Sequence, residues 1–146
     1  MLCMKRLAQI LPYLILILAI LGVSDAAYLT YEHYSKVVPP CSIHWWIADC
    51  GKVLRSPYSM IYGVPLALLG TLHYTGELIL AIILAFAKRD WAKWLLTVTT
   101  CLGLLSSAYF VYLMVGVIGA ICWYCLGSAV ISLLLWISTM MLYRKQ

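Results

Sequence analysis

The 146-residue sequence is 65% hydrophobic and only 10% charged, and it carries a formal net charge of +5. A soluble domain is typically about half apolar and about a quarter charged, so a chain this short could not hide so much apolar surface from water. The composition therefore excludes intrinsic disorder, a broad basic face for nucleic acid and an ordinary cytosolic enzyme, and it predicts an integral membrane protein.

Four apolar stretches are long enough to cross a bilayer, which takes roughly 20 residues of helix. In chain order they are residues 7–31, 63–87, 94–114 and 121–143. The first stretch exceeds the roughly 7–15 apolar residues of a signal peptide, so we expect a retained helix. We predict an all-α membrane protein with a single domain over residues 1–146, a bundle of four transmembrane helices and one long outer loop, residues 32–62.

The long loop carries Cys41 and Cys50. In an exported loop, a structural disulfide is the default interpretation of such a pair. Residues 39–40 are both proline and Gly51 follows Cys50, which favours a segment that moves between two partners. A static bridge and a redox relay both remain open at this point.

Ser56 and Pro57 are typical of a helix start, because Ser caps helices and Pro suits their first position. They predict a short helix lying along the membrane, residues 57–62, that leads into the second span. Ser56 would be its cap, or would donate a hydrogen bond near a substrate. Arg55 is either a solvated cation or a group that stabilises a thiolate or a reduced ring oxygen.

Three ionisable side chains fall inside the spans: Asp25, His73 and Glu77. His73 and Glu77 are four residues apart, so they share one face of a helix. Ionisable groups at this depth are costly and usually face the interior of the bundle. The pair either packs as a mutually satisfied unit or carries protons, and the same two interpretations apply to Asp25.

The fourth span opens with a C-x-x-C motif, Cys122 to Cys125. The unpaired N–H groups and the dipole of a helix N-terminus favour a thiolate, which is the nucleophile of thiol–disulfide exchange. Haem attachment requires His directly after the second Cys, where this chain has Leu126. A zinc site and inert packing are the alternatives to redox chemistry. Cys3 and Cys101 have no predicted partner.

Basic residues mark the cytoplasmic side of membrane proteins. Seven of them flank the spans on the side of both termini, and three lie in the long loop. The seven are Lys5, Arg6, Lys88, Arg89, Lys93, Arg144 and Lys145; the three are Lys36, Lys52 and Arg55. We therefore expect both termini in the cytoplasm. Both cysteine pairs then lie at the same outer surface, which is oxidising in a bacterium.

The joint pattern resembles the vitamin K epoxide reductase family, in particular its bacterial branch. The matching pieces are the Cys41…Cys50 pair, Ser56-Pro57-Tyr58, Ile61-Tyr62-Gly63-Val64-Pro65-Leu66-Ala67-Leu68-Leu69-Gly70, Cys122-Trp123-Tyr124-Cys125, and residues 25–34 in the first span. The resemblance covers nearly the whole chain.

The resemblance implies a four-helix bundle around a quinone, ubiquinone or menaquinone, that accepts electrons. Bacterial members oxidise an exported thioredoxin-like protein, often fused at the C-terminus. Because this sequence ends at Gln146, we expect a separate partner. The expected location is a bacterial inner or plasma membrane, with lipid around the bundle and the active site facing outward.

The resemblance also assigns roles. Cys41 would meet the partner, Cys50 would exchange with Cys122, and Cys125 would lie deepest and pass electrons to the quinone. The implied quinone contacts are Ser56, Arg55, Tyr62, Leu66 and Ala129. Animal members have a Tyr where Ala129 stands and a quinone-binding Asn that has no match here, Leu66 falling near it. These departures bear on vitamin K epoxide as a substrate and leave quinone reduction intact.

Three other functions fit part of the pattern. A DsbB-like quinone reductase also has four spans, but its C-x-x-C lies in the first outer loop and its relay pair in the second, the reverse of the order here. A non-enzymatic metal-binding membrane subunit would use the outer cysteines as ligands. A small transporter could use Glu77 as a coupling acid, which leaves the cysteines unexplained.

Overall fold

The computed structural model describes the backbone of residues 2–36 and 49–144, and the side chains within 10–36 and 49–144. The long helices are α1 (Leu2–Ser35), α3 (Leu66–Ile82), α4 (Asp90–Tyr112) and α5 (Trp123–Tyr143), with π-helical extensions η2 (Ile83–Ala87) and η3 (Leu113–Ile118) on α3 and α4. Within these described residues, four helices are long and apolar enough to cross a membrane, which confirms the predicted four-span fold.

The first and third helices are longer than the predicted spans, whereas the second and fourth begin two or three residues later than predicted, at Leu66 and Trp123. The first continues beyond residue 31 to Ser35, and the third begins at Asp90, before the predicted residue 94, and ends at Ile118. A helix that leaves the hydrocarbon keeps its backbone groups hydrogen-bonded until the chain turns. The turns come at left-handed residues, Lys88 with φ 49° after η2 and Gly119 with φ 64° after η3.

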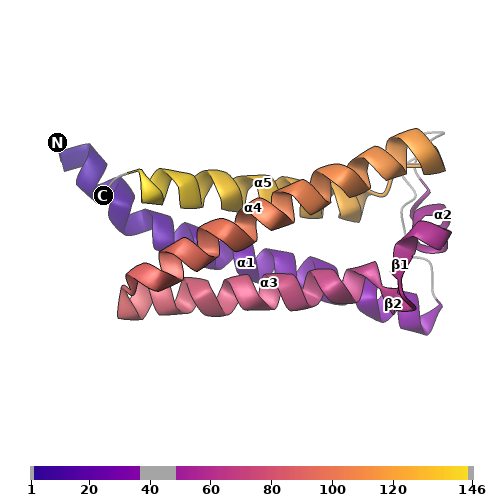
Figure 1. Cartoon of the computed structure of the whole chain (residues 1–146), viewed down its shortest axis with the longest axis horizontal. Coiled ribbons are helices and arrows are strands. Elements are labelled where there is room, and N and C mark those ends of the chain that lie inside the picture. Colours follow the sequence, from indigo (N-terminus) through magenta and orange to yellow (C-terminus); the bar gives the residue numbers. More distant parts are fainter. Residues whose placement is uncertain (1, 37–48, 145–146) are drawn as a thin grey trace.

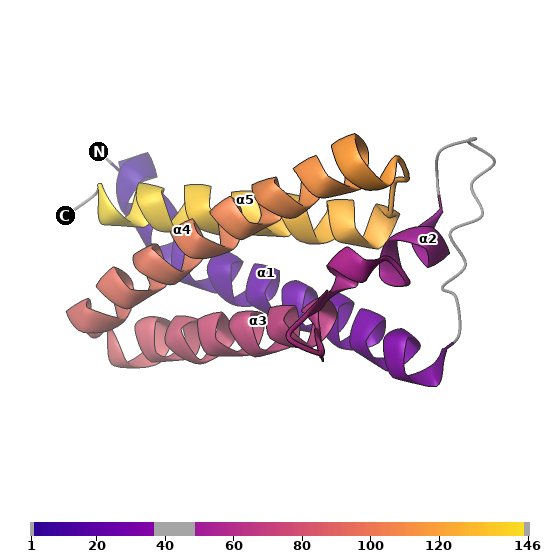
Figure 2. The ribbon, with the colours of Figure 1, turned by 45° about the vertical axis from the view of Figure 1, so that its right-hand side comes forward.

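The two ends of the bundle differ in character (Figure 1). Both termini lie at one end, together with the short α3–α4 connection. The opposite end carries α2 (Cys50–Leu54) and the two-stranded hairpin of β1 (Met60–Ile61) and β2 (Val64–Pro65). Figures 1 and 2 both show α3 and α4 meeting near the terminal end and diverging toward α2.

The segment before α3 differs from the predicted helix over residues 57–62. Only Pro57–Ser59 is helical, as the single 3₁₀ turn η1. The chain then forms the β1–β2 hairpin, whose turn residues Tyr62 and Gly63 have φ 50° and 81°. Positive φ at both turn residues suits the right-handed twist of a two-residue hairpin, so it ends the helix that Ser56-Pro57 starts. Ser56 occupies the cap position, but its hydroxyl donates to Val53 O at 2.8 Å instead of capping.

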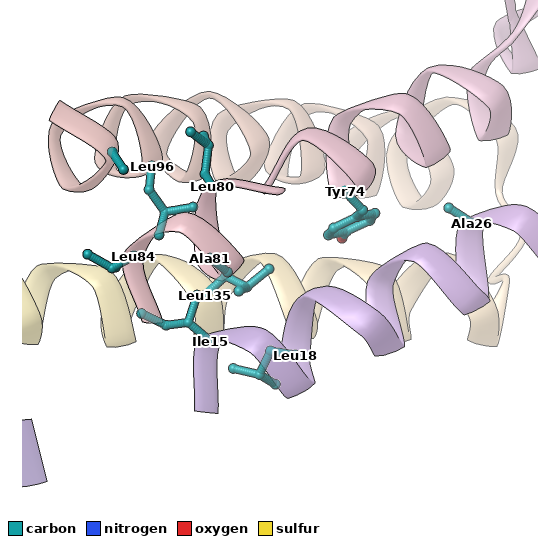
Figure 3. Close-up of a cluster of buried hydrophobic side chains, with 10 residues drawn as sticks. Ile15, Leu18, Ala26, Tyr74, Leu80, Ala81, Leu84, Leu96 and Leu135 are labelled. Carbon is teal, nitrogen blue, oxygen red and sulfur yellow. The ribbon is translucent and has the colours of Figure 1, made fainter. Parts of the chain in front are cut away.

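The main apolar core fills the terminal half of the bundle (Figure 3). It joins Ile15 of α1, Ala81 of α3 and Leu135 of α5, all of them fully buried. Tyr74 and Ala26 belong to the same cluster and lie to one side of its other members in Figure 3. A second buried cluster, at the α2 end, contains Cys50, Met114 and Cys122.

Candidate redox site

The C-x-x-C motif sits at the start of α5, as the sequence predicts. Cys122 is the N-cap residue, and its Sγ accepts a hydrogen bond from the Cys125 backbone N–H at 3.4 Å. The Cys122 N–H donates to Met114 Sδ at 3.2 Å, which fixes the backbone where the chain enters the helix. Both thiols are free, Cys122 buried and Cys125 half-buried.

The hydrogen bonds from Cys125 lower the pKa of Cys122 below its ordinary value, even though burial acts in the opposite direction. The positive end of the α5 dipole favours the thiolate in the same way. Of the two thiols, Cys122 is therefore the one prepared to act as a nucleophile.

Cys50 lies in the same buried cluster as Cys122. It is disulfide-bonded and 1% exposed. A backbone hydrogen bond from Asp49 N–H to Ile121 O, 3.1 Å long, ties the residue before Cys50 to the residue before Cys122. The start of α2 is thus held against the start of α5, which brings together two cysteines 72 positions apart in the numbering. Cys41 lies outside the described residues.

A cavity of about 730 Å³ opens beside the second thiol. Cys125 is in its wall, and the lining comes from all four long helices and from the segment between α2 and α3. The wall is mostly apolar, with residues such as Leu66, Leu102 and Phe110. Cavities of this size and character are typical of sites for small apolar ligands.

Hydroxyl groups below Cys125 line one side of this cavity. Tyr74 Oη lies 2.8 Å from Ser128 O and 2.8 Å from Ser132 Oγ, which joins α3 to α5. Ser107 Oγ donates to Ser132 Oγ at 3.1 Å and joins α4 to the same group. Cys125, Ser128 and Ser132 follow one face of α5, because they are three and four residues apart.

The Vitamin K epoxide reductase family model matches residues 13–140 of the chain. The chain belongs to this family. It is also similar to the thiol-disulfide oxidoreductase LTO1 of Arabidopsis thaliana, with 34% identity over 116 residues that cover 74% of this chain and 30% of the relative. The chain thus spans about a third of the length of that curated relative. Together with the four spanning helices, the family match makes it an integral membrane protein of the vitamin K epoxide reductase family.

The family membership decides against the DsbB-like alternative, which belongs to a different family with the reverse order of cysteine pairs. In the part of the chain that the structure describes, no three His, Cys, Asp or Glu side chains come together as a possible metal site.

The structure separates the five predicted quinone contacts into two groups. Ser56 and Leu66 line the cavity. Arg55 does not; it lies in a shallow depression over α2 with Asp49. Tyr62 is fully exposed at the tip of the hairpin, and Ala129 is half-buried on α5 beside the lining residue Ser128.

Sequence reasoning missed several lining groups. The predicted site residues do not include four hydroxyl-bearing residues of the lining: Tyr74, Ser107, Ser128 and Ser132. The four-residue spacing of Ser128 and Ser132 places two hydroxyls on one helix face in an otherwise apolar span. His33, near the end of α1, also lines the cavity. Polar groups in a transmembrane helix usually face the protein interior, so this spacing is a signal that a sequence reader could use.

Proposed function

We propose that the protein oxidises an exported thioredoxin-like protein and passes the electrons to a membrane quinone. One observation carries the proposal: the C-x-x-C motif lies between the buried cluster of Cys50 and the apolar cavity, and only its second cysteine, which packs against that cluster, also lines the cavity. Cys122 lies in the buried cluster with Cys50. Cys125 lies in the wall of the apolar cavity. A motif in this position can collect electrons from one site and release them at the other.

The relay begins outside the bundle. A thiolate of the reduced partner attacks the disulfide of Cys50, whose other half we propose to be Cys41. The second thiol of the partner resolves the mixed disulfide, so the partner leaves oxidised and Cys41 and Cys50 become thiols. Exchange of this kind moves two electrons without any change in the number of sulfur–sulfur bonds.

Cys50 then attacks the Cys122–Cys125 disulfide at Cys122. Cys125 leaves as a thiolate, and Cys41 frees Cys122 by closing on Cys50 again. The result is an oxidised outer pair beside a reduced C-x-x-C. The arrangement in the structure is consistent with this stage, since Cys50 is disulfide-bonded while Cys122 and Cys125 are free.

The cavity residues fit a quinone ring, which is flat and apolar apart from two carbonyl oxygens. Leu66 and Phe110 offer apolar surface, and the hydroxyl of Ser106 lines the same space as a hydrogen-bond donor. The hydroxyls of Ser56 and Ser59 also line it, but they already donate to Val53 O and Ser56 O, so they can only accept. A bound quinone supplies an acceptor for two electrons and two protons. The thiols of Cys122 and Cys125 release two electrons and two protons when they close a disulfide.

The orientation in the membrane is part of the proposal. Both termini lie at one end of the bundle and α2 at the other. The basic residues concentrate at the terminal end, which supports termini in the cytoplasm and a thiol relay that faces outward.

The test uses the purified full chain in lipid nanodiscs, a reduced thioredoxin-like protein, and a short-chain benzoquinone or naphthoquinone. We expect oxidation of the protein thiols that depends on quinone, and its loss in Cys125→Ser. Cys101→Ser is the matched control, because Cys101 is a free, half-buried cysteine on α4 that does not line the cavity. Absence of turnover with both quinones, or full turnover in Cys125→Ser, would refute the proposal.

A further inference from the structure

An ion pair lies inside the membrane-spanning part of α3. His73 Nε2 is 3.2 Å from Glu77 Oε1, but the two groups are not aligned for a hydrogen bond. The Glu77 side chain is only 2% exposed, and its second oxygen, Oε2, has no hydrogen-bond partner in the structure. A buried carboxylate that satisfies so few of its bonds is costly in hydrocarbon, and ionisable groups kept at such depth usually serve a function.

The neighbouring helix leaves space for this pair. A Cβ atom on Gly103 of α4 would lie 2.5 Å from His73 Nε2, closer than two such atoms can approach. Any larger residue at position 103 would therefore turn the imidazole away from its present place. The absence of a side chain at Gly103 is what allows the ring to lie between α3 and α4.

His73 connects the pair to the cavity. The imidazole is 30% exposed and lines the same cavity as Cys125, whereas Glu77 lies one helical turn further along α3 and is not in the wall. Since Nε2 faces Glu77, the other ring nitrogen, Nδ1, is the one left for the cavity. The other titratable side chains that line the cavity are His33 of α1, Tyr58 of η1, Tyr74 of α3, Tyr109 of α4 and Cys125 of α5. Asp25 of α1 is not in the wall, but its carboxyl group, like that of Glu77, acts electrostatically on Tyr74.

We propose that His73 is the proton donor of the quinone cavity and that Glu77 is its positioning residue, which holds the ring and balances its charge. This inference rests on the proposed quinone reduction and names the group that supplies a proton to it. Reduction of a quinone consumes two protons, and an apolar cavity within the bilayer has little water to provide them.

Protons and electrons balance over one turnover. Cys122 and Cys125 lose two electrons and two protons as their disulfide forms, and the quinone gains the same numbers. His73 gives one of these protons from Nδ1 and passes from imidazolium to neutral imidazole, with the carboxylate of Glu77 unchanged. One of the two thiols supplies the second proton of the quinone. The other thiol releases its proton to solvent, and His73 takes one up from solvent before the next turnover.

The test measures a single turnover as a function of pH. The full chain in nanodiscs, with Cys122 and Cys125 reduced, is mixed with a short-chain ubiquinone, and the loss of quinone absorbance is followed. In the wild type the rate should fall at alkaline pH, as expected of a reaction that needs a general acid. His73→Asn should lower the rate about 100-fold, a usual contribution of a general acid. It should also remove the fall in rate at alkaline pH, which is the alkaline limb of the profile.

Two further variants separate chemistry from packing. Glu77→Gln should also lower the rate, because the imidazolium loses its counter-charge. Gly103→Ala keeps both residues but turns the ring, so it should reproduce the loss seen in His73→Asn. Thr75→Val is the control on the same helix, since the Thr75 hydroxyl bonds only to Thr71 O within α3. Quinone affinity, from tryptophan fluorescence, should change less than threefold in every variant.

Each outcome supports or overturns the proton-donor role. An alkaline limb that persists in His73→Asn and Gly103→Ala overturns this inference while leaving quinone reduction in place. Loss of quinone affinity in step with rate would also overturn it, because the pair would then be part of the binding surface. If His73→Asn or Glu77→Gln prevents folding, Gly103→Ala still tests the proton-donor role, since the His73 imidazole can rotate away from the new methyl group. Absence of quinone reduction in the wild type refutes the proposed function itself.

Discussion

Gly22 on α1 provides the sharpest test of how the bundle is packed. A Cβ atom at this position would lie 2.5, 2.7 and 2.8 Å from Cδ1, Cε1 and Cγ of Tyr74. These are atoms of a ring that is 3% exposed, and the tyrosine hydroxyl is held by Ser128 and Ser132. Gly22→Ala therefore has to displace either the Tyr74 ring or α1 itself.

The expected cost combines two terms. Overpacking of a filled interior costs about 1–3 kcal/mol. Moving the Tyr74 ring also weakens its hydrogen bonds to α5, each worth about 0.6 kcal/mol on average in membrane proteins. Gly76→Ala is the matched control, because it is also in a helix and a Cβ atom there meets nothing within 4 Å. Both variants gain the same helix propensity, so Gly22→Ala should be less stable than Gly76→Ala by about 2–4 kcal/mol.

Reversible unfolding in mixed detergent micelles measures this difference. A double-mutant cycle adds a stricter test, because Tyr74→Ala removes the ring that the new methyl group would meet. In that background, Gly22→Ala should cost no more than Gly76→Ala. Equal stability of the two glycine variants in the wild-type background would show that α1 and α3 are not packed as described.

Three further predictions concern the thiols. Because hydrogen bonds from Cys125 lower the pKa of Cys122, the thiolate absorbance of Cys122 should appear at higher pH in Cys125→Ala, and an unchanged titration would contradict this origin of the shift. Replacing Cys41 and Cys50 together by Ala should abolish activity with the protein partner but retain activity with a small dithiol. Loss of both activities with a lower melting temperature would indicate a structural bridge, worth about 2–4 kcal/mol. On intact cells after reduction, a membrane-impermeant thiol reagent should label Cys41 or Cys50. Labelling of Cys3 would instead indicate the opposite orientation, with the termini outside.

Much of the fold could be predicted because it depends on local properties of the chain. An apolar run of about 20 residues must form a helix in a bilayer, since only a helix satisfies its own backbone. The C-x-x-C motif is similar: its place at the helix start is set by the apolar run behind it. The structure accordingly has Cys122 as the N-cap residue of α5.

The segment before α3 could not be predicted in the same way. Ser56-Pro57 starts a helical turn in many contexts, and the length of that turn depends on the conformation of the next few residues. Here Tyr62 and Gly63 both adopt positive φ, which closes a hairpin and leaves Tyr62 fully exposed. The family resemblance implies Tyr62 as a quinone contact, which stays a prediction. The resemblance could not predict the exposure of this side chain, because that depends on the turn beside it.

The sequence by itself determined that this protein has four membrane-spanning segments and a C-x-x-C pair at the start of the last one. Composition, length and motif spacing are properties of single segments, so they can be read without knowing the tertiary structure. Only the tertiary structure decided which of these segments meet. The bond from Asp49 to Ile121 places Cys50 beside Cys122. At the end of the bundle where α3 and α4 diverge, a cavity is lined by both Cys125 and His73. Such contacts depend on how helices cross, and in lipid that is set by side-chain packing and hydrogen bonds between distant parts of the chain.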